Sequence, residues 1–202
     1  MKKILLSLLA LASSTAVFAG SFEGAYIGAG AGAQYAENKN MNGDSGTFSN
    51  EKMSDTHFLG QITAGYAFDI NQDFNLNTNI FFNLSNDKTG STSGITGKTK
   101  NNIGVSIEPG YYLNKDTLAY IKLGYARLDS KLDDPANSSS SNTTLDGFLW
   151  GAGAKYHLDK NIFVGAEVVE YNYGSNSVTL GGSSTSYKTN QTTGLINVGY
   201  QF

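Results

Sequence analysis

Four charged residues lie in segments where apolar and polar side chains otherwise alternate: Glu108, Lys122, Lys155 and Glu167. All four fall on the polar side of that alternation, and they comprise two acids and two bases. An isolated buried charge is very costly, whereas a paired and hydrogen-bonded set is tolerated. We therefore predict that they fill an interior as pairs on adjacent strands, Glu108 with Lys122 and Lys155 with Glu167. A rearrangeable plug that lets ions leak is the functional alternative.

The sequence has two histidines, His57 and His157. An enzyme acting on lipids would need an activated nucleophile, or a histidine positioned beside a carboxylate and a hydroxyl. Ser54 and Asp55 lie close to His57, but on a loop edge where both are ordinary turn residues. Strand counting places the two histidines near opposite ends of the fold. We therefore predict no catalytic residues and no enzymatic activity, with a lipid-modifying enzyme as a less favoured alternative.

Cofactor and metal sites are not expected either. Cysteine is absent, so a disulfide framework and a thiolate metal site are both excluded. Asp133 and Asp134 have no histidine at ligand spacing. Gly28, Gly30 and Gly32 alternate along a strand with no helix after them, unlike a nucleotide-binding loop. The net charge of −3, with lysine and arginine spread along the chain, argues against a nucleic-acid partner.

The N-terminus has the order of features of a secretory signal peptide, residues 1–19. Lys2 and Lys3 precede the apolar run from Ile4 to Leu11, and a small-residue pattern ends at Ala19 before Gly20. The run is shorter than the roughly 20 residues that a spanning helix needs. Cleavage between Ala19 and Gly20 would leave residues 20–202 as one domain.

Strands are the elements that must position these residues. Eight segments show period-two alternation: Phe22–Tyr35, His57–Phe68, Phe74–Leu84, Asn102–Leu113, Thr117–Leu128, Leu145–Leu158, Ile162–Tyr173 and Tyr187–Phe202. Each is near or above the roughly 9 to 11 residues that a tilted strand needs to cross a bilayer. The predicted long connections are Ala36–Thr56, Ser85–Asn101, Asp129–Thr144 and Gly174–Ser186. The short ones are Asp69–Asp73, Asn114–Asp116 and Asp159–Asn161, so all long loops lie on one side.

The two faces of these strands differ sharply in polarity. One face carries a set of apolar residues, from Ile27 to Phe202, with no charge among them, while the other holds glycine, asparagine and the four charged residues. In hydrocarbon, strands satisfy their backbone groups only in a closed barrel, so the apolar face meets lipid. We predict an all-β, eight-stranded antiparallel transmembrane up-and-down β-barrel, with a soluble lipocalin-like barrel as the alternative. Interfacial aromatic girdles are expected from Phe68, Phe74, Tyr111, Tyr156, Phe163 and Tyr200 at one end and Tyr35, Phe58, Phe82, Tyr125, Tyr171 and Tyr173 at the other.

The last segment, LINVGYQF, resembles the C-terminal signature of outer-membrane proteins. It places Ile196, Val198, Tyr200 and Phe202 on alternate positions. With the mature start Gly24–Gly28 and the stretch Trp150–Glu167, the mature chain resembles the outer-membrane β-barrel domain family, which includes the OmpA membrane domain and opacity-type surface proteins. The resemblance implies the outer membrane of a Gram-negative bacterium, lipid and lipopolysaccharide as surroundings, and a terminal signature read by the barrel assembly machinery. OmpA's peptidoglycan-binding domain does not follow, so cell-wall anchoring is not carried over.

The sequence thus predicts a non-enzymatic, monomeric outer-membrane protein with a structural or surface role. Its loops are rich in Ser, Thr, Asn and Gly, as in Ser138–Thr144 and Gly181–Thr185. Such loops are available for adhesion or contact with host or partner molecules. A narrow, porin-like ion-leak channel is the alternative function, and in OmpA-type barrels a comparable charged plug is proposed to rearrange.

Overall fold

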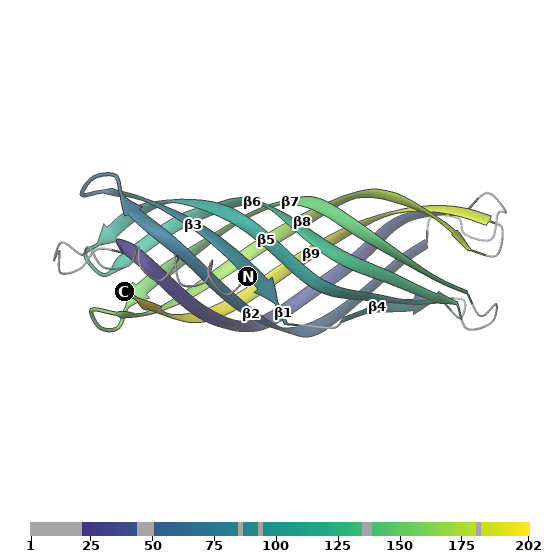
Figure 1. Ribbon diagram of the computed structural model, residues 1–202, viewed down its shortest axis with the longest axis horizontal. Coiled ribbons are helices and arrows are strands. Elements are labelled where there is room, and N and C mark those ends of the chain that lie inside the picture. The colour runs from purple at the N-terminus through teal and green to yellow at the C-terminus, as the bar shows by residue number, and fades with distance from the viewer. Residues whose placement is uncertain (1–21, 44–50, 85–86, 93–94, 135–138, 181–182) are drawn as a thin grey trace, which may run out of the picture.

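The computed structural model describes residues 22–43, 51–84, 87–92, 95–134, 139–180 and 183–202, and these form an elongated β-barrel (Figure 1). The expected signal peptide and its cleavage point, Ala19 and Gly20, lie outside the described residues. The strands are β1 (Gly24–Gly43), β2 (Glu51–Asp69), β3 (Phe74–Asn83), β4 (Asp87–Thr92), β5 (Ile95–Asn114), β6 (Thr117–Asp134), β7 (Ser139–His157), β8 (Ile162–Leu180) and β9 (Ser183–Gln201).

Eight of these strands close on themselves. The order β3-β2-β1-β9-β8-β7-β6-β5 is completed by pairing of β3 with β5, and every pairing is antiparallel. β4 is a short addition that pairs only with β5. The predicted eight-stranded up-and-down barrel is therefore confirmed, and closure removes the open edges from the part of the wall that meets lipid.

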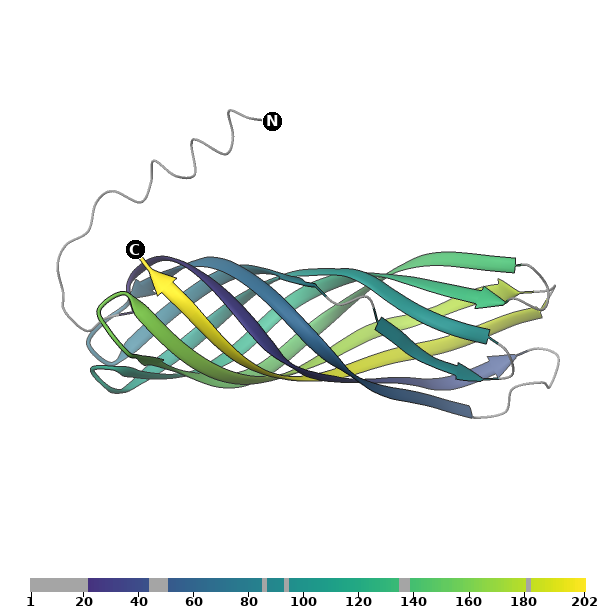
Figure 2. The same cartoon turned by 90° about the horizontal axis from the view of Figure 1, so that it is seen from below.

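The tight turns gather at one end of the barrel, the end at which the C-terminus lies (Figures 1 and 2). In the first turn, the backbone N–H of Ile70 donates to the carbonyl of Phe74 at 2.9 Å, and the Asn71 side chain accepts from the amides of Asp73 and Phe74. The turn before β8 repeats this pattern, with Leu158 donating to Ile162 at 2.8 Å. The short connections fall where the sequence predicts them, at what we take as the periplasmic end.

The predicted long loops are wrong in extent, because paired strands continue through most of their length. β6 and β7 pair as far as Asp134 with Ser139, and β8 and β9 as far as Leu180 with Ser183. Outside the membrane the outer face of a strand meets water instead of lipid, so stretches rich in Ser, Thr and Asn can form a ladder without an apolar alternation. We use the term outer extension for the parts of the strands that lie beyond the aromatic rings at the outer end. The outer extension includes β4, which lies inside the predicted loop Ser85–Asn101.

An apolar belt surrounds the barrel, as the alternation predicts. Its outward side chains include Ile27, Ile62, Ile80, Val105, Ile121, Trp150, Val168, Ile196 and Val198, all at least 47% exposed. Lipid is the medium in which so large a continuous apolar surface is stable. Among the described residues, no helix has the length and apolar character to cross a membrane.

The interior is less polar than predicted. One apolar cluster fills the outer half, including Phe81, Leu128, Leu149 and Tyr171, and a second, around Phe163, fills the periplasmic half. Three aromatic rings expected in the girdles, Phe163, Tyr171 and Tyr173, are instead buried inside, each no more than 3% exposed. The reason is strand parity, since all three lie at odd positions of β8 while its lipid-facing residues, such as Val168, lie at even positions.

Candidate functional site

The four predicted charged residues meet in the middle of the lumen. Lys122 Nζ lies 2.9 Å and 3.0 Å from the two carboxylate oxygens of Glu167 and 3.3 Å from Glu108. Lys155 Nζ lies 2.9 Å from the other oxygen of Glu108. All four side chains are at most 6% exposed. The predicted pair Glu108–Lys122 is therefore confirmed, whereas the predicted pair Lys155–Glu167 is wrong.

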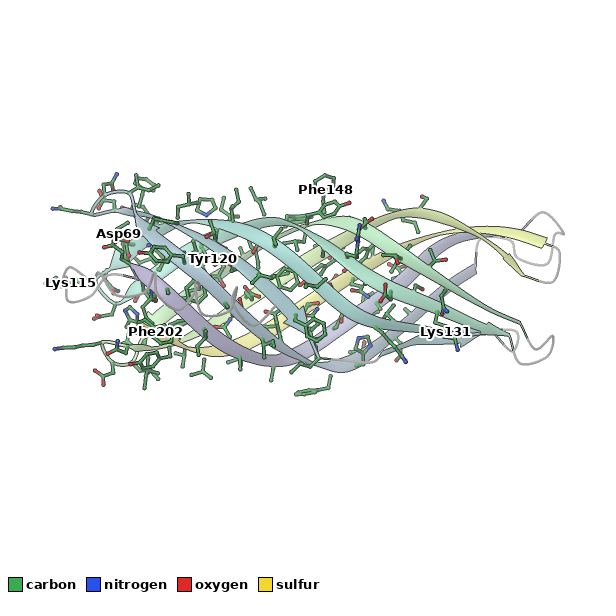
Figure 3. The ribbon with its side chains drawn as sticks, viewed as in Figure 1. Asp69, Lys115, Tyr120, Lys131, Phe148 and Phe202 are labelled. Carbon is green, nitrogen blue, oxygen red and sulfur yellow. The ribbon has the colours of Figure 1, made fainter. Side chains whose placement is uncertain are left out.

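The register of the strands explains the different pairing. Glu167 on β8 lies opposite Gly153 on β7, which lies opposite Tyr120 on β6. Because Gly153 has no side chain, the space over β7 between Tyr120 and Glu167 is open. The Tyr120 hydroxyl reaches across it and donates to Glu167 at 2.9 Å. A Cβ on Gly153 would lie 2.5 Å from that hydroxyl. Lys155 is two residues nearer the periplasmic end than Gly153, and its ammonium group reaches Glu108 across the lumen instead (Figure 3 labels Tyr120).

Neutral groups complete the hydrogen bonding of this network. Asn79 donates from Nδ2 to Glu108 at 2.6 Å, and Ser106 donates to Asn79 Oδ1 at 2.9 Å. The ammonium group of Lys155 also lies 4.8 Å from the ring centre of Tyr120, a cation–π distance. Two positive and two negative charges thus compensate one another within one buried, hydrogen-bonded set, which is the condition under which buried charge is tolerated.

A cavity of about 20 Å³ lies beside the network. Two buried oxygens face it without a protein hydrogen-bond partner, Tyr26 Oη and Asn197 Oδ1. A polar cavity of this size has room for about one water molecule. This space beside the network is therefore far smaller than an aqueous pore.

Phe22 closes the periplasmic mouth of the lumen. Its ring is 1% exposed and stacks on His157 with centroids 3.8 Å apart. Its backbone N–H donates to the Tyr112 hydroxyl at 2.8 Å, and that hydroxyl donates to Asp69 at 2.6 Å. The segment before β1 is therefore inserted into the mouth. The sequence analysis gives Phe22 only as the start of a strand. Its even position, the same parity as that of the inward Tyr26, is the signal that predicts an inward ring.

The outer half of the lumen holds His57, whose Nε2 lies 3.2 Å from Gln34 Oε1, while Gln34 donates to Gln191. His157 lies under Phe22 at the other end, so the structure does not bring the two histidines into one site. Within the described residues, no group of three or more His, Cys, Asp or Glu could hold a metal ion. The side chains of Asp133 and Asp134 lie outside those described.

Charged residues return on the outward face just beyond the outer aromatic rings. Tyr125 and Phe148 are cross-strand partners with ring centroids 5.4 Å apart, and the next pair outward is Arg127 with Asp146. Arg127 Nε donates to Asp146 at 2.7 Å, and this bond holds the pKa of the Asp146 carboxyl below its usual range. The exposed pair marks where the wall leaves the apolar belt (Figure 3 labels Phe148, and Lys131 further out).

The C-terminal residues Ile196, Val198, Tyr200 and Phe202 all face outward, between 44% and 72% exposed. The rings of Tyr200 and Phe202 contact at 5.1 Å between centroids, and the Phe202 amide donates to Ala25 on β1 at 2.9 Å. β9 thus carries the signature on the lipid side of the strand that closes the barrel against β1.

A closed antiparallel barrel of eight strands, with a charge-free apolar belt outside and a filled, partly charged lumen inside, is an outer-membrane β-barrel. The chain belongs to the outer membrane protein beta-barrel domain family, whose model matches residues 4–202. Its compartment is the outer membrane. No curated protein matches the chain in a sequence comparison.

Several solved structures share the fold. OprG from Pseudomonas aeruginosa superposes with a TM-score of 0.62 at 16% identity, covering 92% of this chain and 99% of OprG. Neisserial surface protein A gives 0.57 at 17% identity, over 88% and 97%. Ail, the attachment invasion locus protein of Yersinia pestis, gives 0.54 at 15% identity, over 88% and 99%, in a complex with the heparin analogue sucrose octasulfate.

The same kind of barrel also carries an enzyme. The outer membrane protease OmpT from Escherichia coli superposes with a TM-score of 0.52 at 8% identity, over 94% of this chain and 99% of OmpT. At these identities the likeness concerns the fold alone, so function has to be argued from the residues of this chain.

Proposed function

We propose that the protein is a closed, non-conducting barrel that displays its outer extension to partners outside the cell. The observation that carries this is the length of the strands. β6 continues from Tyr125 to Asp134, and β7 runs from Ser139 before it reaches Phe148. About 9 to 11 residues are enough to cross a bilayer. The remaining residues form a hydrogen-bonded wall that holds the outer connections away from the membrane surface.

Ail, a structural neighbour with an attachment role in its name, supports a display function, but the charge of this chain favours a different kind of ligand from a polyanion. The four outer connections predicted from the sequence contain eight acidic residues (Glu37, Asp44, Glu51, Asp55, Asp87, Asp129, Asp133, Asp134) and six basic ones (Lys39, Lys52, Lys88, Lys98, Lys100, Lys131). Such a mixed surface does not concentrate positive charge as a sulfated ligand requires. A protein partner fits it better.

The filled lumen supports a display barrel over an ion-leak channel. Three fillings follow one another along the lumen from the outer end: the outer apolar cluster, the network of Glu108, Lys122, Lys155 and Glu167, and the ring of Phe22. An eight-stranded barrel has an interior just wide enough for its own side chains. The separated histidines favour a non-enzymatic role. We further propose a monomer in lipid and lipopolysaccharide, whose Tyr200 and Phe202 are read by the barrel assembly machinery after cleavage at Ala19.

A shortened barrel tests the display function. Ser130 and Thr143 are cross-strand partners, so replacing residues 131–142 by Asn-Gly leaves a two-residue hairpin between them. Cells of a non-adherent bacterium that display the wild-type barrel should gain attachment to cultured epithelial cells, and cells displaying the shortened barrel should not. Surface labelling and the gel shift on boiling control for equal amounts of folded barrel. Equal attachment by both variants, or by neither, contradicts the proposal.

A further inference from the structure

A proline lies in the middle of the pairing between β5 and β6. The ladder stops at Ile107 and resumes at Gly110 in the same register. Between these two residues, Pro109 lies opposite Ile121 on β6 without forming a ladder pair. Proline has no N–H, and within sheets it is usually confined to edge strands, strand starts and bulges. Here β5 has a neighbouring strand on both sides, so the missing N–H leaves a backbone acceptor without its donor.

The acceptor left without a donor is the carbonyl of Ile121. Alternate residues of an antiparallel strand direct both backbone groups to the same neighbour. The Tyr112 amide donates to the residue just before β3, so the even-numbered residues of β5 face β3 and Pro109 faces β6. The Asp116 carbonyl accepts from His157 of β7, so the even-numbered residues of β6 face β7 and Ile121 faces β5. The Ile121 carbonyl therefore points to a residue that cannot donate.

A groove of about 530 Å³ lies on the lipid side of this interruption. Its walls include the outward side chains of Ile70, Phe74, Tyr111 and Ile121, all at least 48% exposed, and Pro109 borders it as well. Ile70 belongs to the turn between β2 and β3, so the groove lies at the periplasmic end of the apolar belt. The volume falls within the range of roughly 300–1,000 Å³ that is usual for small-molecule sites.

The chemistry of the groove indicates which kind of ligand would enter it. Elsewhere in the wall a hydroxyl bonds a backbone carbonyl, as Thr63 does to Ile80 at 3.2 Å, but within the described residues no side chain donates to Ile121. An unsatisfied backbone group is costly in hydrocarbon, because no water replaces the missing partner. The described residues that line the groove carry no charge, so a phosphate or carboxylate deep inside it would lack a counter-charge. A neutral hydroxyl is the donor that fits.

Polar and charged groups return at the periplasmic end of the groove. The side-chain oxygen of Asn71 accepts from the amides of Asp73 and Phe74, which leaves its N–H₂ group facing the surroundings. Lys115 lies in the turn that joins β5 and β6, the two strands beneath the groove (Figure 3 labels Lys115 at this end of the barrel). A phosphate at this level would have a neutral donor and a cation beside it.

A lysophospholipid combines these features, since it has one acyl chain, a free glycerol hydroxyl at the head of that chain and a phosphate next to the glycerol. We propose that the groove binds a lysophospholipid of the periplasmic leaflet. Its chain lies along the apolar belt, its glycerol hydroxyl donates to the Ile121 carbonyl, and its phosphate lies near Asn71 and Lys115. A diacyl phospholipid carries an ester in place of this hydroxyl. The groove lies at the end opposite to the outer extension, so lipid binding is independent of the proposed display function.

Lipid binding to the folded full-length barrel tests this site. The barrel is kept in an amine-oxide detergent, which has no hydroxyl group, and native mass spectrometry measures the bound lipid. The probe is palmitoyl lysophosphatidylcholine, whose glycerol hydroxyl is its only hydrogen-bond donor. Its deoxy analogue, which lacks that hydroxyl, is the matched ligand. We expect the wild type to bind the probe at least about fivefold more tightly than the deoxy analogue, the effect of one hydrogen bond.

Three variants connect this preference with the interrupted ladder. Pro109→Val supplies the missing N–H to the Ile121 carbonyl, so the preference for the probe should fall below about twofold. Ile103→Val, on the lipid-facing side of the same strand but outside the groove, should keep the wild-type preference. Ala119→Leu fills the groove from β6, so binding of both lipids should be lost.

The wild-type barrel also gives a direct readout of the hydrogen bond. The carbonyl ¹³C signal of Ile121 should shift when the probe is added and stay in place with the deoxy analogue. Equal binding of the two lipids, binding of neither, or a preference retained by folded Pro109→Val would overturn the inference. Diacyl phosphatidylcholine bound as tightly as the probe would overturn it as well, because the groove would then hold bulk lipid.

Discussion

Tyr120 on β6 and Glu167 on β8 form a hydrogen bond of 2.9 Å although a whole strand lies between them. The bond passes over Gly153, and the same arrangement recurs in the barrel: Tyr26 faces Gly65, Phe81 faces Gly104, Phe163 faces Gly199 and Tyr173 faces Gly147. At each of these glycines a Cβ would lie within 2.8 Å of the partner ring. Inward aromatic rings thus fill the lumen by lying over glycines of the next strand.

Gly153→Ala should destabilise the barrel by about 1–3 kcal/mol, because the new methyl group would clash with the Tyr120 side chain that lies over Gly153. It would also lie 2.7 Å from the Ala166 carbonyl, which cannot move without disturbing β8. Gly194→Ala is the matched control, since nothing lies within 4 Å of a Cβ there, and it should change stability by no more than about 0.5 kcal/mol. Urea unfolding in detergent gives both values. An equal loss in the free energy of unfolding for the two variants would refute the role of the open space over Gly153.

Lys122→Met should cost about 3–5 kcal/mol, because it leaves Glu167 without a cation and Glu108 with one cation instead of two. Adding Glu167→Gln to Lys122→Met should recover part of that loss, since the remaining acid, Glu108, keeps Lys155. Urea midpoints of the wild type and the single and double variants check this. A double variant no more stable than Lys122→Met would contradict the pairing seen here.

Phe22→Ala should open the periplasmic mouth and destabilise the barrel by about 3–5 kcal/mol, the usual loss for a buried ring. The chain has no native cysteine, so Asn77→Cys provides a single thiol in the lumen near this mouth. Its alkylation should be slow behind Phe22 and much faster in the alanine variant, with Phe22→Leu in between. Equal alkylation rates with and without the ring would show that Phe22 does not close the mouth.

The carboxyl of Asp146 should titrate at lower pH than an ordinary aspartate, because the Arg127 hydrogen bond lowers its pKa. With a lowered pKa, the pair supports the fold above the ordinary value and is lost only as the pH falls through the depressed one. Carboxyl ¹³C shifts measured against pH give the midpoint. Arg127→Gln should return it toward about 3.9, and a midpoint indifferent to that substitution would disprove the coupling.

The strands and their lipid-facing sides were predictable from sequence because hydrocarbon forces a strict alternation. The same parity predicts an inward position for Phe22, Phe163 and Tyr171. Their closeness to strand ends instead suggested interfacial girdles for Phe163 and Tyr171, and parity is the stronger signal. The outer extension could not be predicted this way, since a strand whose outer face meets water instead of lipid needs no apolar period. The partner of Lys155 depends on stagger between strands, which residue types alone do not encode.

Channel recording on the folded wild-type barrel tests the central claim, a closed lumen, most directly. A shift in gel migration on boiling first establishes that the reconstituted protein is folded. We predict no discrete conductance in planar bilayers, because charges, rings and Phe22 fill the lumen from end to end. Regular single-channel openings by the folded protein, altered in Lys122→Met, would contradict the closed barrel and establish the ion-leak channel in its place.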